Sequence, residues 1–272
     1  MKRLILFAGL NLLSFATFSQ LKLQKVWETG SGLKTPESAL YDPKKDIIYI
    51  SNIGNDQQPE SGFISQLQKD GKIRKLDWVT GLTAVKGLGL YKNLLYAAET
   101  KSVVVIDVEK AGIVQRIPVD SAQFLNDITI DDRGVVYVSD TRKNKIHQIA
   151  DGKVTVYLEN MKSVNGLLAK GTDLYILSDG SLYKADKNKQ IQKLAGDMEK
   201  STDGIVMLMP GKFIVTSWIG TIYYVAANAP VQLLSDTRAE KINTADLGYN
   251  PKDKIIYVPT FFNNTVIAYK ID

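Results

Sequence analysis

Three residues, Glu37, Asn165 and Asp203, carry the oxygen atoms that hard divalent cations prefer as ligands. The set contains neither histidine nor cysteine, which favours Ca²⁺ first and also suits Mg²⁺ or Mn²⁺, whereas Zn²⁺ is a less natural occupant. This chemistry requires the three side chains to meet, although they are far apart in the sequence.

The three residues occupy equivalent places in a repeated pattern. Each stands before an apolar run, which ends in a turn and is followed by a second run such as DIIYISN, DLYILSD or KFIVTSW. Six copies occur, and the residues at this place are Glu37, Lys86, Asn126, Asn165, Asp203 and Ala245. Successive copies are about 40 residues apart, a period typical of propeller blades made of short strands. The sequence therefore predicts an all-β fold, a six-bladed β-propeller.

The first strand of a propeller blade lies beside the central channel, so we expect these six residues to form a ring at one mouth of the channel. The second strands return to the same face, and their ends should form a wider rim: Asn52, Glu99, Asp140, Asp179, Trp218 and Thr260. The short side chain of Ala245 would leave room in the ring for water or substrate, as an open metal site requires. We expect the functional site at this mouth.

The last blade is expected to take one strand from the beginning of the chain. After Ala245 the sequence supplies only three segments that resemble strands, DLGYNP, KIIYVPT and TVIAYKID. The segment LKLQKVWETGSG, residues 21–32, has partial polar and apolar alternation and can supply the outer strand. This pairing would cover two exposed sheet edges and close the ring. A free N-terminal arm is the alternative.

The beginning of the chain indicates export. Met-Lys-Arg is followed by the apolar run LILFAGLNLLSFATFS, the pattern of a secretory signal peptide. Cleavage after Ser19 would leave residues 20–272 as one propeller domain; cleavage after Ala16 and an uncleaved anchor are alternatives. We expect a periplasmic or secreted protein that has no membrane attachment once the signal is removed. The chain has no cysteine, which excludes disulfides and thiolate sites.

Charge and composition exclude two further classes of function. The formal net charge is +5, and basic and acidic residues are interspersed without a basic stripe, so nucleic acid is not an expected partner. The only histidine, His147, falls in a predicted outer strand, so a Ser-His-Asp triad is not expected.

Four motifs resemble those of a known superfamily, that of gluconolactonase, regucalcin (senescence marker protein) and the luciferin-regenerating enzyme. They are PESALYD with Glu37, FLNDITIDDRG with Asn126, VNGLL with Asn165 and TDGIV with Asp203. They occur in the family's blade order across nearly the whole mature chain. The resemblance implies a six-bladed propeller in which Glu37, Asn165 and Asp203 bind one divalent cation and Asn126 lies beside the metal and the substrate.

The resemblance also implies a reaction, the hydrolysis of a sugar lactone or a related ester. The cation would polarise the carbonyl and stabilise the oxyanion, and Asp203 or a hydroxide on the cation would act as base or nucleophile. Asn126 would orient this small-molecule substrate.

The sequence departs from the family pattern at several places. Ser38 and Tyr41 replace a glycine and a tryptophan of the first motif. Phe124 stands where sugar-lactone members often have an arginine that binds substrate hydroxyls, which indicates a less polar substrate or none. Lys86 could neutralise the carboxylates, bind a substrate carboxylate or point out of the mouth. Trp218 is expected to line the pocket rim or to pack between blades.

A second class of function therefore remains open. Propellers serve many unrelated functions, and a non-catalytic propeller that binds a small molecule or an unknown partner protein fits the same fold. The set of Glu37, Asn126, Asn165 and Asp203 favours the hydrolase. Phe124 and Lys86 favour the binding protein.

Overall fold

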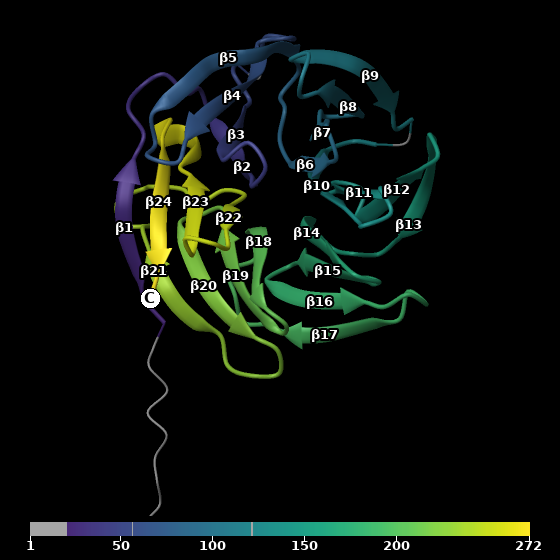
Figure 1. The fold of residues 1–272 in the computed structure, drawn as a ribbon. Coiled ribbons are helices and arrows are strands. Elements are labelled where there is room, and N and C mark those ends of the chain that lie inside the picture. Colours follow the sequence, from purple (N-terminus) through teal and green to yellow (C-terminus); the bar gives the residue numbers. More distant parts are fainter. Residues whose placement is uncertain (1–20, 56, 121) are drawn as a thin grey trace, which may run out of the picture.

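The structure, a computed structural model, describes residues 21–272 except residues 56 and 121. It consists of six four-stranded antiparallel sheets arranged around a central channel (Figure 1). The predicted six-bladed β-propeller is confirmed. The predicted signal peptide, residues 1–19, lies outside the described residues. Among the residues described, no helix has the length and apolar character needed to cross a membrane.

The blades follow one another along the chain. Blade one contains β2 (Pro36–Asp42), β3 (Ile47–Asn52), β4 (Gly62–Gln68) and β5 (Ile73–Leu82). Blade two contains β6 (Leu88–Tyr91), β7 (Leu94–Ala98), β8 (Ser102–Asp107) and β9 (Gly112–Pro118). Blade three contains β10 (Leu125–Ile130), β11 (Val136–Asp140), β12 (Lys145–Ala150) and β13 (Lys153–Leu158).

The second half of the ring repeats this arrangement. Blade four contains β14 (Val164–Lys170), β15 (Asp173–Ser178), β16 (Ser181–Ala185) and β17 (Ile191–Ala195). Blade five contains β18 (Thr202–Met209), β19 (Lys212–Ser217), β20 (Thr221–Ala226) and β21 (Gln232–Asp236). Blade six contains β22 (Gly248–Asn250), β23 (Ile255–Pro259), β24 (Val266–Ile271) and β1 (Leu23–Glu28), with the short 3₁₀ turn η1 (Phe261–Asn263) between β23 and β24.

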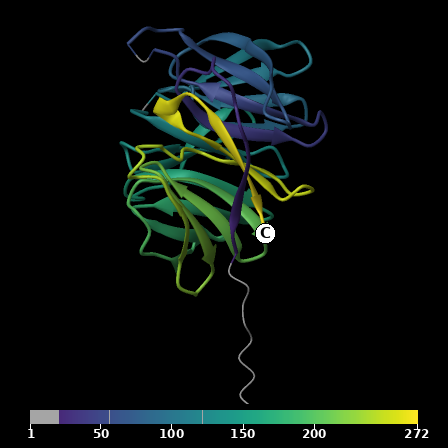
Figure 2. The same cartoon turned by 90° about the vertical axis from the view of Figure 1, so that its left-hand side faces the viewer.

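The N-terminal strand closes the ring as predicted. β1 pairs antiparallel with β24, with Leu23 opposite Ile271, and runs along the outside of the last blade (Figure 2). The indole ring of Trp27 stacks on Tyr257 with ring centroids 5.7 Å apart, and its N–H donates to the Lys69 carbonyl at 2.7 Å. Trp27 therefore connects blade six to blade one.

The hydrophobic core is divided among the interfaces between blades. Each apolar cluster combines residues of two neighbouring sheets, as where Tyr49 and Ile64 of blade one meet Leu95 and Val104 of blade two. The second strands β3 and β11 are buried along their whole length, whereas β13, an outermost strand, has no buried residue. A blade therefore buries its apolar faces only against its neighbours, which makes the closed ring the stable unit.

Four first strands begin with a β-bulge, in which two residues oppose one residue of the second strand. The paired residues are 37–38, 126–127, 165–166 and 203–204. In three of these blades a hydroxyl of the second strand, on Ser51, Ser139 or Thr216, accepts the spare backbone N–H at 2.9 Å. The bulge therefore fixes the position of the polar residue at the start of the strand.

Close packing of neighbouring strands explains why a glycine follows both Asn165 and Asp203. A Cβ atom on Gly166 would lie 2.1 Å from the Asp203 carbonyl oxygen, and one on Gly204 would lie 2.5 Å from the Leu247 nitrogen. The first strands of neighbouring blades thus approach too closely for any side chain at these positions. This close approach brings polar residues of different blades together on the channel axis.

Candidate functional site

The predicted ring and rim lie on one face of the propeller, which we call the mouth face. The residue that starts a first strand pairs with the end of the second strand in four blades: Pro36 with Asn52, Leu125 with Asp140, Val164 with Ser178 and Thr202 with Ser217. First strands surround the channel (Figure 1). The ring residues therefore meet at the channel.

Glu37, Asn165 and Asp203 bring oxygen atoms together in a buried place. Glu37 is 5% exposed and Asp203 3% exposed. The Asn165 amide nitrogen, Nδ2, donates to Asp203 Oδ1 at 2.5 Å. Glu37 Oε2 and Asn165 Oδ1 are buried and accept no hydrogen bond from any described residue. Buried polar atoms without a partner are rare in folded proteins, and these two oxygens are suited to accept a hydrogen bond or to contact an ion.

The local electrostatics disfavour the charged form of both carboxylates. Burial, followed by the charges of Asp203 and Asp246, raises the pKa of Glu37 well above its ordinary value, while the positive charge of Lys86 lowers it. Burial and Asp246 likewise raise the pKa of Asp203, while the hydrogen bond from Asn165 lowers it. A divalent cation would stabilise both carboxylates in their charged form.

Two further buried carboxylates, Asp127 and Asp246, were not among the predicted site residues. Asp127 accepts the N–H groups of Leu167 and Ile128, each at 2.6 Å. Asp246 Oδ2 accepts the Ser38 hydroxyl at 2.5 Å. Burial, followed by the charge of Asp246, raises the pKa of Asp127, and burial raises that of Asp246 to about 7.

The repeated pattern did not identify these two residues, because each follows the position that the pattern marks in its blade. Asp127 follows Asn126 in a bulge, where both residues of the pair approach the channel. Asp246 follows Ala245, and an isolated parallel bridge joins it to Ser38. Ala245 itself is fully buried, and the Asp246 carboxylate lies beside the channel instead. The sequence signal that could have identified them is an aspartate directly after the chosen position, as in Asn126-Asp127 and Ala245-Asp246.

Lys86 is buried but forms no ion pair with a carboxylate of the described residues. Its ammonium nitrogen, Nζ, donates to the Ala84 carbonyl at 2.9 Å and lies 4.5 Å from the centre of the Phe124 ring. Burial lowers the pKa of Lys86, while the charge of Glu37 raises it. Lys86 therefore leaves Glu37 Oε2 free, and its ammonium group is held at the side of the site.

The other predicted substrate-binding residues also lie on the mouth face. The guanidinium of Arg142 lies 4.8 Å from the centre of the Phe124 ring, so two cations flank this ring. Asn126 Nδ2 donates to Thr141 Oγ1 at 3.2 Å. Trp218 makes edge contacts with Phe261 and Phe262, with ring centroids 5.4 and 5.8 Å apart.

Among the described residues, a cation site would have to combine carboxylate and amide oxygens. No group of three or more Asp, Glu or His side chains in the described chain comes together as a metal centre. An ion on the axis would therefore need amide oxygens, which Asn165 provides through its unpartnered Oδ1. The predicted ligand set has this composition, and its two buried oxygens without partners fit a hard cation.

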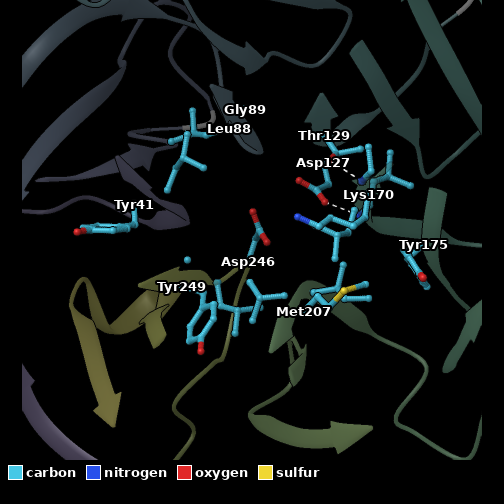
Figure 3. Close-up of a pocket in the computed structure, with 18 of the residues that line it drawn as sticks. Tyr41, Leu88, Gly89, Asp127, Thr129, Lys170, Tyr175, Met207, Asp246 and Tyr249 are labelled. Carbon is cyan, nitrogen blue, oxygen red and sulfur yellow. Dashed lines mark hydrogen bonds between the residues drawn. The ribbon is translucent and has the colours of Figure 1, made fainter. Parts of the chain in front are cut away.

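A cavity of about 710 Å³ occupies the channel on the opposite side of the ring. It is lined by the later parts of the first strands of all six blades, and Asp127 and Asp246 contribute their carboxylates to it (Figure 3). Glu37, Asn165 and Asp203 do not line it. The predicted site and this cavity are therefore different places on the same axis.

His147 has no place in either site. It is 1% exposed in β12, the third strand of blade three, and its Nε2 is 3.8 Å from Asp140 Oδ2. Burial lowers its pKa, although the nearby Asp140 raises it.

Comparison with known proteins supports the fold. No protein-family model and no curated protein matches the sequence. Among solved structures, a streptogramin B lyase superposes with a TM-score of 0.69 at 10% identity, covering 93% of this chain and 98% of that chain. A catalytically inactive His-to-Ala variant of virginiamycin B lyase from Staphylococcus aureus, determined with quinupristin, superposes with a TM-score of 0.66 at 12% identity. The match covers 92% of this chain and 99% of that chain. The selenomethionine form of that lyase superposes with a TM-score of 0.62 at 16% identity, covering 93% of this chain and 89% of that chain.

These similarities establish the six-bladed propeller over nearly the whole chain. At such low identity they show the fold alone. The fold implied by the gluconolactonase resemblance is confirmed, and membership of that family remains a prediction.

Proposed function

We propose that this protein is an exported hydrolase that uses one divalent cation, Ca²⁺ first, to open a lactone or related ester at the mouth face. One observation carries the proposal. Glu37 Oε2 and Asn165 Oδ1 are buried without partners in the described chain, and Asn165 is hydrogen-bonded to the buried Asp203. Three oxygen donors from blades one, four and five are thereby available to one ion.

The chain's own residues have distinct tasks in this proposal. When bound, the cation would supply Lewis acidity that polarises the substrate carbonyl. Asp203 accepts the proton of the attacking water at Oδ2, because Asn165 holds its Oδ1. The hydroxyl joins the acyl carbon, the acyl C–O bond breaks, and Asp203 passes the proton to the leaving oxygen. Asn126 is placed beside Thr141 and offers its amide oxygen to a substrate hydroxyl.

The residues around the site favour an amphipathic substrate that carries an acid group. Lys86 and Arg142 place two positive charges against Phe124, which suits a carboxylate on the substrate. Trp218 and the 65% exposed Phe262 supply an apolar surface on the opposite part of the rim. These features replace the polar sugar-binding arginine of the related lactonases.

The lyases found by the structural comparison suggest an elimination reaction instead of hydrolysis, but the residues of this chain do not favour it. Replacement of one histidine inactivates the virginiamycin lyase. The chain has a single histidine, His147, which is buried in blade three away from the channel. A histidine-dependent elimination therefore lacks its residue here.

A non-catalytic binding protein is the second candidate. The cavity opposite the mouth is large enough for a small organic ligand, and its walls are mostly apolar. Such a protein would need no cation, so cation dependence separates the two candidates.

A hydrolysis screen tests the proposal. Chelator-treated protein would be assayed with γ-lactones, δ-lactones and aryl esters, each with and without a carboxylate, before and after addition of CaCl₂. We expect turnover only with the cation, and at least about a hundredfold loss in Asp203→Asn.

Asp179→Asn is the matched control, since Asp179 lies on the same face and pairs with Lys162 away from the axis. It should retain full activity. Turnover that survives both chelation and Asp203→Asn would overturn the proposal, as would the absence of turnover with every ester and lactone.

A further inference from the structure

The cavity on the side opposite the mouth face, which we call the channel cavity, has the size and chemistry of a ligand site. Its volume of about 710 Å³ lies within the range of pockets that hold small organic molecules. All six blades contribute to it through their first strands. The mouth-face residues Glu37, Asn165 and Asp203 are not part of its wall, so a ligand here would occupy a different place from the proposed hydrolase site.

The walls of the channel cavity are predominantly apolar. Leu88 of blade two and Leu247 of blade six are among the buried lining residues, and Met207 of blade five adds a flexible thioether side chain. In Figure 3 the Asp246 carboxylate lies in the middle of the view, with Asp127 and Lys170 to its right, Tyr249 below it, and Tyr41 and Tyr175 farther out. A ligand here would bury an apolar body against aliphatic groups.

Two carboxylates interrupt this apolar lining. Asp127 and Asp246 are 5% and 9% exposed, and both contribute to the cavity wall. The donors that contact them are neutral: the N–H groups of Leu167 and Ile128 for Asp127, and the Ser38 hydroxyl for Asp246. No Lys or Arg of the described chain forms an ion pair with either carboxylate. One cation, Lys170, also lines the cavity, but it is exposed and forms no ion pair with either carboxylate in the described chain. The channel cavity thus combines two acidic groups that lack an ion-pair partner with mostly apolar walls.

We propose that the channel cavity binds an organic ammonium ion with an apolar body, of the arylalkylamine class, and that Asp127 and Asp246 hold its ammonium group. The ammonium would supply the missing positive charge and up to three hydrogen-bond donors. The apolar body would fill the space between the first strands. An inorganic cation fits less well, because the wall around the two carboxylates is mostly aliphatic, whereas a hard ion is held by six or more oxygen atoms.

A series of three ligands of the same shape tests the charge requirement. 4-Phenylbutylamine, 4-phenylbutanol and 4-phenylbutanoate would be titrated into the full chain at pH 8 by isothermal calorimetry. We expect the amine to bind with one site, the alcohol to bind at least about tenfold more weakly, and the acid not to bind. Equal affinity for amine and alcohol, or no binding of the amine at millimolar concentration, would overturn the proposal.

Two variants test the location. Met207→Trp should fill the channel cavity and abolish amine binding while leaving the cation content at the mouth face unchanged. The control is Leu233→Trp, on the outermost strand of the same blade, where the side chain is 47% exposed and does not line the cavity. It should bind the amine as the unmodified protein does.

Competition with Ca²⁺ separates this site from the mouth face. In the Glu37→Gln variant the amine should bind with unchanged affinity in the presence of 10 mM CaCl₂, a concentration of order 1000 times that of the protein. If Ca²⁺ displaces the amine in that variant, the channel cavity takes an inorganic ion and the proposal is wrong. Loss of lactone hydrolysis without loss of amine binding would contradict only the proposed hydrolase function.

Discussion

Asp246 shows how a buried carboxylate couples stability to pH in this protein. Its side chain is enclosed by neighbouring first strands, and its hydrogen bonds come from neutral groups. Burial raises its pKa from the usual 3.8 to about 7. Below about pH 4 the carboxyl group is protonated in both the folded and the unfolded chain, so ionisation does not affect stability. As the pH rises toward 7, only the unfolded chain gives up its proton, and folding is disfavoured.

We therefore predict that Asp246→Asn stabilises the cation-free protein at alkaline pH. A shift of about 3 pKa units corresponds to about 4 kcal/mol, so the variant should gain up to about 4 kcal/mol in unfolding free energy at pH 8 and little at pH 4. Urea unfolding of both proteins in EDTA measures the difference. A variant that is destabilised equally at both pH values would contradict this account.

At the scale of single elements, the β-bulge at the start of β18 determines where Asp203 lies. Thr216 of β19 is fully buried, accepts the Gly204 N–H at 2.9 Å and donates to the Ala245 carbonyl at 2.9 Å. One hydroxyl thus satisfies a group of its own blade and a group of the next. It holds the bulge and the neighbouring first strand in register.

Thr216→Val keeps the shape of this side chain and removes both hydrogen bonds. The Gly204 N–H and the Ala245 carbonyl would be left buried without partners, so we expect a loss of about 2 to 4 kcal/mol in unfolding free energy. Urea unfolding measures the loss, and cation titration should show weaker binding because Asp203 is no longer held in place. Thr155→Val, an exposed change on β13, should alter stability by less than about 0.5 kcal/mol. Equal stability of the two variants would refute the role of the hydroxyl.

At the scale of the whole molecule, closure of the ring depends on the N-terminal strand. Trp27 lies between blade six and blade one, where it stacks on Tyr257 and donates to the Lys69 carbonyl. Its ring also lies against Gly71, where a Cβ atom would come within 2.6 Å of it. The chain has no cysteine, so non-covalent contacts of this kind must hold the two ends of the ring together.

Trp27→Ala should therefore destabilise the propeller by about 3 kcal/mol or more, because it removes both the aromatic contact and the hydrogen bond. The adjacent Val26 is 49% exposed, and Val26→Ala should have little effect. Chemical denaturation of both variants measures the difference. If Trp27→Ala unfolds at the same urea concentration as Val26→Ala, the strand does not hold the ring closed.

The sequence was sufficient to predict the architecture, because each blade repeats the same order of polar residue, apolar run and turn. The position of Glu37, Asn165 and Asp203 on one axis followed from that repeat. Asp127 and Asp246 were missed because the repeat marks one polar position in each blade. In blade three a bulge places Asp127 beside Asn126, and in blade six it is Asp246, the residue after Ala245, that lines the channel.

The behaviour of Lys86 could not be predicted either. Its long side chain can reach the carboxylates, the Ala84 carbonyl or Phe124, and only the packing of blades two and three selects among them. The channel cavity could not be predicted from the sequence either. The same pattern of leucine and methionine residues is compatible with a channel filled by side chains and with an open channel lined by them.

Calcium binding by chelator-treated protein tests the central proposal most directly. Calorimetric titration should show one site, and Asp203→Asn and Glu37→Gln should each weaken it at least about tenfold, because each removes a charged ligand from a buried site. Asp179→Asn should bind like the unmodified protein. If the protein binds none of Ca²⁺, Mg²⁺, Mn²⁺ and Zn²⁺, or if both axial variants bind Ca²⁺ as tightly as the unmodified protein, Glu37, Asn165 and Asp203 do not form a cation site.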